Sequence, residues 1–286
     1  METVLESPSK TVVIGPGRPF CVIGERINPT GRKKLQAELQ QGDLSRLEVD
    51  VAQQVPLADM LDVNVGDPLA DEIELMRQAI PLVQGLTDLP LCIDSSVIEA
   101  LEAGLSVYEG KPLVNSVTGE DDRLEEILPL VARHGAAVIG LANDETGIPE
   151  TPQQRVDIAR KIVSAAGDHG IPPEDVVIDP LAMTVGAATD AVTITLETIS
   201  RIRDELGVNM CLGASNVSFG LPRRHALNAA FLPMAMAAGL TSAIMSCAPE
   251  VVGAVRAADL LLGHDEWGAR WIASHRQAEA KAAAGA

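Results

Sequence analysis

LPLCIDS (residues 89–95) is the stretch on which the fold class depends, a short apolar run that ends in an aspartate and a serine. Its apolar residues are continuous rather than alternating, which is typical of a parallel strand buried on both faces. Seven other runs share this design, at residues 21–27, 58–65, 112–117, 136–142, 175–181, 209–215 and 241–246. The chain therefore repeats one strand-like unit about eight times.

Helical patterns separate these runs. Three examples are DEIELMRQAIPLV (71–83), RLEEILPLVARHG (123–135) and QQRVDIARKIVSAAGDHG (153–170), of which the last two end in the glycine that often follows a helix. Eight strand signals alternating with helices favour an α/β protein with a (β/α)₈ TIM barrel. The alternative is a doubly wound open sheet. That fold normally has a glycine-rich turn after its first strand, whereas GPG (15–17) precedes the strand here.

The 286 residues show no linker before the Ala-rich end of the chain. We expect an N-terminal extension over 1–19, one barrel domain over 20–274 and a tail over 275–286. One uncharged window, 226–248, is long enough to raise the question of a membrane span. Its Asn, Pro, Gly and Ser residues predict a helix, a glycine stop and a strand instead.

Composition excludes several classes of protein. A net charge of −18 and 2% aromatic residues argue against a nucleic-acid binder, which needs basic side chains and stacking platforms. The four cysteines lie far apart without a CxxC pair, which predicts reduced thiols rather than a disulfide framework. The first residues lack the basic start and apolar stretch of a signal peptide. We therefore expect a cytoplasmic protein that contacts no membrane.

In such barrels the chemistry lies at the C-terminal ends of the strands. No lysine falls at a predicted strand end, which disfavours Schiff-base chemistry. The five histidines fall in predicted helices or loops away from these ends, so we expect no zinc or metal-hydroxide site. What remains is a ring of carboxylates and amides on the strand ends, including Asp62, Asn64, Asp94, Asn115, Asp179, Ser215 and Asn216.

Such a ring suits a flat, neutral heterocycle with donors and acceptors along its edge. A carboxylate accepts two parallel hydrogen bonds from neighbouring N–H groups, and an asparagine donates and accepts at once. Each residue also has a structural interpretation that the sequence leaves open. Asp94 and Asp179 could cap the following helices, and Asn216 could shape a turn. Glu25 and Arg26 could form a structural ion pair.

The motifs GERIN (24–28), LDVNVG (61–66), CIDS (92–95), VNSVTGE (114–120), GLANDETGIP (140–149), IDPL (178–181), GASNVSFGLP (213–222) and FLPMAMAAGLTSAI (231–244) carry a resemblance. In this order the chain resembles the methyltetrahydrofolate:corrinoid-protein methyltransferases and the folate-binding module of cobalamin-dependent methionine synthase. The resemblance covers nearly the whole chain. It implies a pterin-binding TIM barrel related to dihydropteroate synthase.

The resemblance also implies roles for individual residues. Asp94, Asn115 and Asp179 would hold the pterin ring. Asn216 would act catalytically near N5 as this nitrogen is protonated. Asp62, Asn64 and Ser215 would support the site or lie at its rim, and Arg224 would face the folate tail or the partner. No strong acid stands out among these residues, so the source of the N5 proton stays open.

The implied activity is methyl transfer between N5 of tetrahydrofolate and the cobalt of a corrinoid. No D-x-H-x-x-G corrinoid signature occurs, since the Asp-His pair near a glycine reads GDHG (167–170). Cobalamin should therefore arrive on a separate corrinoid protein, and the resemblance suggests a homodimer. Two alternatives stay open. One is a dihydropteroate-synthase-type enzyme, disfavoured because SNVSFGLP replaces that enzyme's lysine-bearing segment, and the other is a non-catalytic folate-binding subunit.

Overall fold

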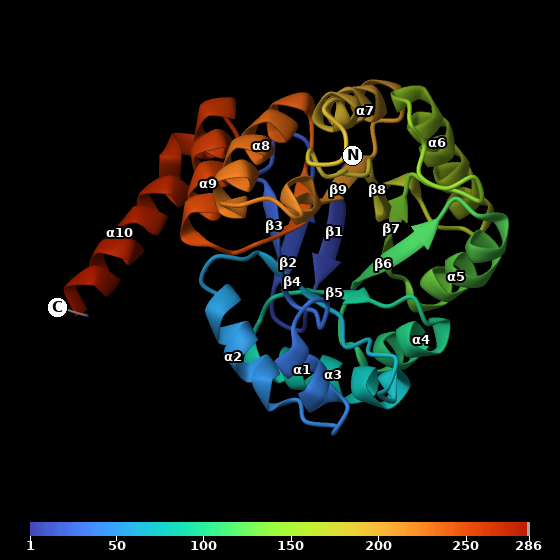
Figure 1. Ribbon diagram of the computed structural model, residues 1–286, viewed down its shortest axis with the longest axis horizontal. Helices are drawn as coiled ribbons and strands as arrows, with labels where there is room; N and C mark the ends of the chain where they lie inside the picture. The colour runs from blue at the N-terminus through green and yellow to red at the C-terminus, as the bar shows by residue number, and fades with distance from the viewer. Residues whose placement is uncertain (285–286) are drawn as a thin grey trace.

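The computed structural model describes residues 1–284, with side chains through residue 276, and contains a closed barrel of eight parallel strands ringed by helices (Figure 1). The barrel closes where the last strand pairs with the first, with Ser242 opposite Cys21. The strands are β3 (Cys21–Ile27), β4 (Met60–Val63), β5 (Leu91–Asp94), β6 (Leu113–Thr118), β7 (Ala137–Leu141), β8 (Val176–Asp179), β9 (Asn209–Gly213) and β10 (Ser242–Met245). The predicted (β/α)₈ barrel is confirmed, and the open-sheet alternative is wrong because the sheet has no free edge.

Helices cover the outside of the barrel and connect its strands. They are α1 (Lys33–Leu39), α2 (Ser45–Gln54), α3 (Glu72–Leu86), α4 (Ile98–Val107), α5 (Asp121–His134), α6 (Pro152–Asp168), α7 (Ala191–Glu205), α8 (Arg224–Ala238), α9 (Pro249–Leu262) and α10 (Ala269–Ala284). Three short 3₁₀ helices are η1 (Pro173–Asp175), η2 (Ala214–Ser218) and η3 (Glu266–Gly268). In Figure 1, α10 extends away from the barrel toward the C-terminus.

Local sequence signals set several helix ends. Helix α6 begins with a capping box, in which Thr151 Oγ1 accepts from Gln154 N and the backbone N–H of Thr151 donates to Gln154 Oε1. Helix α5 ends at Gly135, whose φ of 60° is left-handed and is easily reached only without a Cβ. The glycine stop after α5 lies where the sequence predicts it.

An N-terminal hairpin closes one end of the barrel. Strand β1 (Thr3–Glu6) pairs with β2 (Thr11–Ile14) in antiparallel register. Leu5 and Ile14 are fully buried against the interior cluster that also holds Cys21 and Ile23 at the start of β3. Asn209, at the start of β9, donates to Thr3 Oγ1 at 2.9 Å. The N-terminal end of the barrel is therefore covered, and the open end is the one where the strands finish.

The uncharged window 226–248 divides as predicted. Helix α8 ends at Ala238, Gly239 follows with a φ of 123°, and β10 begins at Ser242. None of the helices in the described part of the chain is long and apolar enough to cross a membrane. The four cysteines, all within the described residues, are free thiols, three of them buried.

Candidate functional site

A cavity of about 730 Å³ opens at the C-terminal ends of the strands. Because all eight strands run in the same direction, their last residues meet at one rim. Seven of the eight site residues predicted from the sequence line this cavity: Asp62, Asp94, Asn115, Asp179, Ser215, Asn216 and Arg224. The eighth, Asn64, is not among the lining residues but donates a hydrogen bond to Asp94, which is. The structure thus brings the whole predicted set together.

Asp94, the last residue of β5, is the carboxylate that Asn64 supports. Asn64 Nδ2 donates to Asp94 Oδ2 at 2.9 Å, and Asn64 Oδ1 in turn accepts from the backbone N–H of Gly66. Burial raises the pKa of Asp94 to about 6, against a bond from Asn64 that lowers it. Asp94 Oδ1 remains available to accept a bond from a ligand.

Asp62 lies below Asp94 on the neighbouring strand β4 and is 2% exposed. Asn115 Nδ2 donates to Asp62 Oδ1 at 3.2 Å. Burial, and then the nearby charge of Asp94, raise the pKa of Asp62 well above its ordinary range. Two carboxyls this close do not ionise together at low cost. Asp62 is therefore a buried carboxyl that supports Asn115 at the inner end of the cavity.

Asp179 ends β8 and is held by backbone amides. Its Oδ1 accepts from Leu181 N at 2.7 Å, and its Oδ2 accepts from Gly213 N at 3.3 Å. Burial raises the pKa of Asp179 to about 6, although these two bonds and the charge of Arg155 act in the opposite direction. Neither Asp94 nor Asp179 caps the next helix, since the N-cap residues of α4 and α7 are Val97 and Asp190. The helix-cap interpretation is wrong for both.

Asn216 lies in η2, directly after β9. A Cβ on Gly213 would come within 3.1 Å of Asn216 Nδ2, so the glycine leaves room for this amide. Among residues 1–276, no atom hydrogen-bonds to the Asn216 side chain, and the side chain lines the cavity. Its amide is therefore free to donate to a ligand and to accept from it.

The 3₁₀ turn around Asn216 is fixed by its neighbours. Ser215 Oγ donates to Glu25 Oε1 at 2.8 Å, and Arg224 Nη2 donates to the carbonyl of Ser215 at 2.7 Å. Arg224 Nε also donates to Ser218 Oγ, and its guanidinium lies 5.8 Å from the ring centre of Phe219. Arg224 thus holds this turn in place as well as lining the cavity.

Glu25 is a cavity residue that sequence reasoning interpreted differently. Glu25 accepts from Ser215 Oγ, whereas Arg26 pairs with the buried Asp50, with Nε to Oδ1 at 3.2 Å. The Glu25–Arg26 ion pair is therefore wrong. Burial raises the pKa of Glu25, against the bond from Ser215. The sequence feature that indicates a cavity residue is the position of Glu25 near the end of a predicted strand.

His225 corrects a second expectation. It lines the cavity from the first turn of α8, with Nδ1 at 3.0 Å from Glu250 Oε1 and Nε2 at 3.5 Å from Ser246 Oγ. The prediction that every histidine lies away from the strand ends is wrong here, because α8 begins at the rim after a short loop. Within the described residues, no cluster of three or more His, Cys, Asp or Glu side chains could hold a metal ion.

Comparison with known proteins identifies the family to which this chain belongs. The sequence profile of the family described as "Pterin binding enzyme" matches residues 24–246, which include every predicted site residue. The chain belongs to the pterin-binding enzymes. Over 265 residues it is 30% identical to a methylcorrinoid:tetrahydrofolate methyltransferase from Eubacterium limosum, covering 90% of this chain and 97% of that protein.

Other relatives share part of their length or only their fold. A methionine synthase from Mycobacterium tuberculosis is 34% identical over 78% of this chain, which spans 20% of that protein. A dihydropteroate synthase from Xanthomonas albilineans, solved with 7,8-dihydropteroate, has a TM-score of 0.66 at 21% identity over 87% of this chain and 96% of that one. The enzyme from Vibrio fischeri has a TM-score of 0.66 at 17% identity over 91% and 98%. These likenesses confirm the barrel fold.

Proposed function

We propose that this pterin-binding protein is a methyltransferase that moves a methyl group between N5 of tetrahydrofolate and the cobalt of a corrinoid carried by a separate protein. The observation that carries the proposal is the convergence of Asp94, Asn115, Asp179 and Asn216 on one cavity at the open end of the barrel. The full-length similarity to a methylcorrinoid:tetrahydrofolate methyltransferase supports it.

The proposed roles follow from hydrogen-bonding capacity. The pyrimidine edge of a pterin carries adjacent N–H donors, which suit the ionised carboxylates of Asp94 and Asp179. Asn115 has its Nδ2 engaged by Asp62, which leaves its carbonyl oxygen to accept from the ring. A polar group that loses its water in this cavity needs a hydrogen-bond partner there. Leaving a buried donor or acceptor without one costs about 1–3 kcal/mol of free energy.

In the proposed chemistry the free amide of Asn216 contacts N5. When the methyl group leaves N5, the bonding electron pair returns to nitrogen, and a proton must reach that nitrogen for the ring to leave as neutral tetrahydrofolate. The cob(I)alamin substrate supplies the electron pair of the new carbon–cobalt bond. Asn216 can stabilise the partly protonated nitrogen by hydrogen bonding, which favours the transition state over the bound substrate.

Basic side chains at one side of the cavity suit the anionic end of a folate. Arg26, Arg32, Arg224 and His225 line the cavity of a chain whose net charge is −18. Arg26 and Arg32 share the single carboxylate of Asp50, so one positive charge remains uncompensated there. We assign the carboxylates of the folate tail to this side, with Arg224 nearest to the turn that carries Asn216.

The proposed assembly has two further components. The corrinoid is supplied by a partner protein that docks at the open mouth of the barrel, and two copies of this chain form a homodimer. The proposed domain division is an extension over 1–19, the pterin-binding barrel over 20–274 and a tail over 275–286. A cytoplasmic location stays a prediction.

Methyl transfer is tested by mixing the purified protein with methyltetrahydrofolate and cob(I)alamin and following the corrinoid spectrum. The proposal predicts conversion to methylcobalamin at a rate proportional to protein concentration. Failure of conversion together with absent pterin binding by calorimetry would overturn it. Tight pterin binding without transfer, also with a corrinoid protein, would instead identify a non-catalytic subunit. Product formation from hydroxymethyl-pterin pyrophosphate and p-aminobenzoate would identify the dihydropteroate-synthase type.

A further inference from the structure

One asparagine of α8 occupies a position where the helix pattern requires an apolar side chain. Asn228 is 2% exposed. The other buried residues of this helix are all apolar: Phe231, Leu232, Ala235 and Met236. Together the five positions follow the i, i+3, i+4, i+7, i+8 spacing of a stripe that faces the core. An amide in such a stripe loses its water on folding, so its hydrogen bonds decide whether it stabilises the protein.

The amide of Asn228 is only half satisfied. Its Nδ2 donates to Ser215 Oγ at 3.3 Å, whereas its Oδ1 is buried without a hydrogen-bond partner among residues 1–276. A buried acceptor without a partner loses its bonds to water, and one long bond from Nδ2 does not offset that loss. An apolar side chain at this position would therefore give a fold that is at least as stable.

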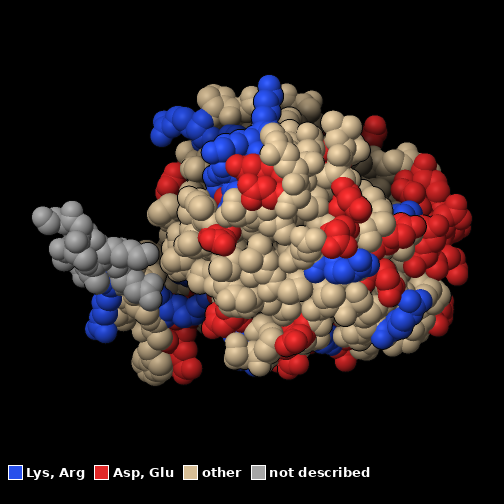
Figure 2. All heavy atoms as spheres, turned by 90° about the horizontal axis from the view of Figure 1, so that it is seen from below, with Lys and Arg blue, Asp and Glu red and all other residues tan. Residues whose placement is uncertain are grey.

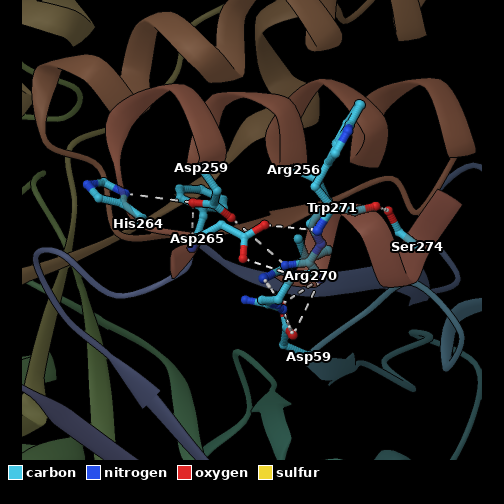
Figure 3. A network of polar contacts seen from close by, with 10 residues as sticks. Asp59, Arg256, Asp259, His264, Asp265, Arg270, Trp271 and Ser274 are labelled. Atoms are coloured by element: carbon cyan, nitrogen blue, oxygen red, sulfur yellow. Dashed lines mark hydrogen bonds and ion pairs between the residues drawn. The ribbon is translucent and has the colours of Figure 1, made fainter. Parts of the chain in front are cut away.

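Three other buried side-chain atoms in the described part of the chain also lack a partner, and each has a local explanation. Arg256 Nη1 and Asp259 Oδ2 lie 4.0 Å apart in one charged network, so their opposite charges compensate each other (Figure 3). Thr118 lines a second cavity, of about 320 Å³, so its hydroxyl belongs to that site. Asn228 lines neither of these cavities and carries no charge, so it needs a different explanation.

Asn228 acts on the turn that carries Asn216. A serine hydroxyl donates one hydrogen and accepts through its lone pairs. Because Asn228 donates to Ser215 Oγ, this oxygen is used as an acceptor there, and its own hydrogen goes to Glu25 Oε1 at 2.8 Å. An amide turned the other way would take the serine hydrogen and leave Glu25 without it. Asn216 follows Ser215 directly in the chain, so the bonds run past it to the cavity wall.

Helix α8 holds Ser215 at two points. Arg224 and Asn228 are four residues apart, which places them on the same face of the helix. Arg224 Nη2 donates to the carbonyl of Ser215 at 2.7 Å, while Asn228 donates to the hydroxyl. The bond to the carbonyl fixes the backbone of the turn. The bond to the hydroxyl fixes the direction in which the serine hydrogen points.

Glu25, which receives this hydrogen, is unlike the carboxylates of the protein surface. Figure 2 shows acidic side chains on the outside of the molecule, where water solvates them. Glu25 lines the cavity, and burial raises its pKa, while the bond from Ser215 acts in the opposite direction. The charged and titratable groups near it are Arg224 and His225 of α8, Asp62 of β4 and Cys247 after β10. A weaker bond from Ser215 would therefore leave Glu25 protonated to a higher pH.

We propose that Asn228 is a positioning residue for methyl transfer, which acts through Ser215 to hold the turn that carries Asn216 and to direct the serine hydrogen to Glu25. This inference rests on the proposed methyltransferase function and adds to it a residue that does not touch the substrate. An apolar side chain at this position could not donate to Ser215. The unmade bond at Oδ1 is thus a loss of stability that the activity requires.

Asn228→Leu should affect stability and activity in opposite ways. The substitution keeps a branched side chain, removes the unsatisfied oxygen and removes the bond to Ser215. The melting temperature should equal or exceed that of the wild type. Methyl transfer from methyltetrahydrofolate to cob(I)alamin, followed by stopped-flow spectra, should slow about 5- to 10-fold, the factor that one hydrogen bond contributes. The dissociation constant of the pterin should change little, because Asn228 lies outside the cavity lining.

Asn209→Leu is the matched control at the opposite end of the barrel. Asn209 is 1% exposed at the start of β9, and its Nδ2 donates to Thr3 Oγ1 at 2.9 Å and to the Ile14 carbonyl at 3.0 Å. Its replacement removes both bonds, so the melting temperature should fall by about 4–8 °C. The rate per folded molecule should stay unchanged. The two buried asparagines should therefore give opposite results in both measurements.

A double-mutant cycle tests whether Asn228 acts through Ser215. If it does, the double variant Ser215→Ala/Asn228→Leu should be no slower than Ser215→Ala alone. In Asn228→Leu the decline of transfer with rising pH should also move to higher pH, because a weaker bond from Ser215 raises the pKa of Glu25. Asn228→Ala, which cannot crowd its neighbours, repeats the measurement of the rate.

Three results would overturn the role of Asn228: unchanged transfer in both of its variants, additive losses in the double variant, or a fall in melting temperature like that of Asn209→Leu. The last result would make Asn228 a structural residue. A wild-type chain that binds the pterin and transfers no methyl group would instead overturn the proposed function, so the two failures are distinguishable.

Discussion

Asn115 and Asp62 lie 53 residues apart in the chain, yet Asn115 Nδ2 donates to Asp62 Oδ1 at 3.2 Å beneath the cavity. The bond engages the amide nitrogen of Asn115 and leaves its carbonyl oxygen to accept from a ligand. Asp62 and Asn115 therefore form one hydrogen-bonded unit in the cavity lining.

Asp94→Asn should weaken binding of methyltetrahydrofolate. The substitution leaves an oxygen that can still accept from Asn64, but it removes the ionised acceptor for the pterin edge. A hydrogen bond to a charged group contributes about 1.5–3 kcal/mol, so the dissociation constant should rise about 10- to 100-fold. Isothermal titration calorimetry measures it, with Asp144→Asn as the control because Asp144 lies in the loop after β7 and outside the cavity. Equal affinities in the two variants would contradict the assignment.

The same Asp94→Asn substitution should stabilise the fold at high pH. The folded protein keeps the Asp94 proton up to a pKa of about 6, whereas an unperturbed Asp releases it near 3.8. The folded state thus binds more protons between these values, and wild-type stability falls as pH rises through the window. Asparagine has no proton to lose. The variant should exceed the wild type by up to about 2–3 kcal/mol at pH 8, and the gain should shrink toward pH 4 in thermal melts.

Pterin binding should release protons near pH 6. Burial raises the pKa values of Asp94 and Asp179 to about 6, and a ligand that donates N–H groups favours their ionised forms. Affinity should therefore increase as pH rises from 5 to 7. Calorimetry in two buffers of different ionisation enthalpy gives the number of protons released. Proton uptake over this range would show that the ring is bound by protonated carboxyls instead.

Asn216→Ala should separate binding from chemistry. The Asn216 amide has no partner among residues 1–276 and lies in the proposed position near N5. Its removal should lower the rate of methyl transfer on the order of 100-fold, as for other donors that act mainly in the transition state. The dissociation constant for the pterin should change only a few-fold. Stopped-flow spectra of the corrinoid give the rate, and Asn143→Ala, from the loop after β7, is the matched control.

Glu25→Gln tests whether this cavity carboxyl sets the pH profile. Glutamine can still accept the bond from Ser215 Oγ, which preserves the turn that carries Asn216. Burial raises the pKa of Glu25, so the wild type keeps this proton to a higher pH than an unperturbed glutamate does. Methyl transfer from methyltetrahydrofolate should slow as pH rises through that pKa. The variant should lose this pH dependence, and an unchanged profile would assign the proton to another group.

Much of the fold could be predicted from the pattern of apolar residues along the sequence. The eight apolar runs match the eight strands closely, as in 91–94 within the predicted 89–95, because strands buried on both faces require continuous apolar sequence. The predicted polar set also comes together. The reason is topological, since parallel strands in a closed barrel end at one rim whatever their separation in the chain.

Other features depended on contacts between distant residues. The sequence does not show that Leu5 and Ile14 cover the N-terminal end of the barrel. The barrel residues against which a hairpin packs are decided only when the chain folds.

The sequence by itself determined the barrel, its open end and the residue types around the cavity, since strand burial and strand direction are local properties. Only the tertiary structure decided which groups pair there. Glu25 bonds to Ser215, 190 residues away, and not to Arg26, because the buried Asp50 of α2 engages Arg26 instead. It likewise decided that Trp267 and Leu261 are exposed, since the exposure of a side chain depends on how the surrounding helices pack.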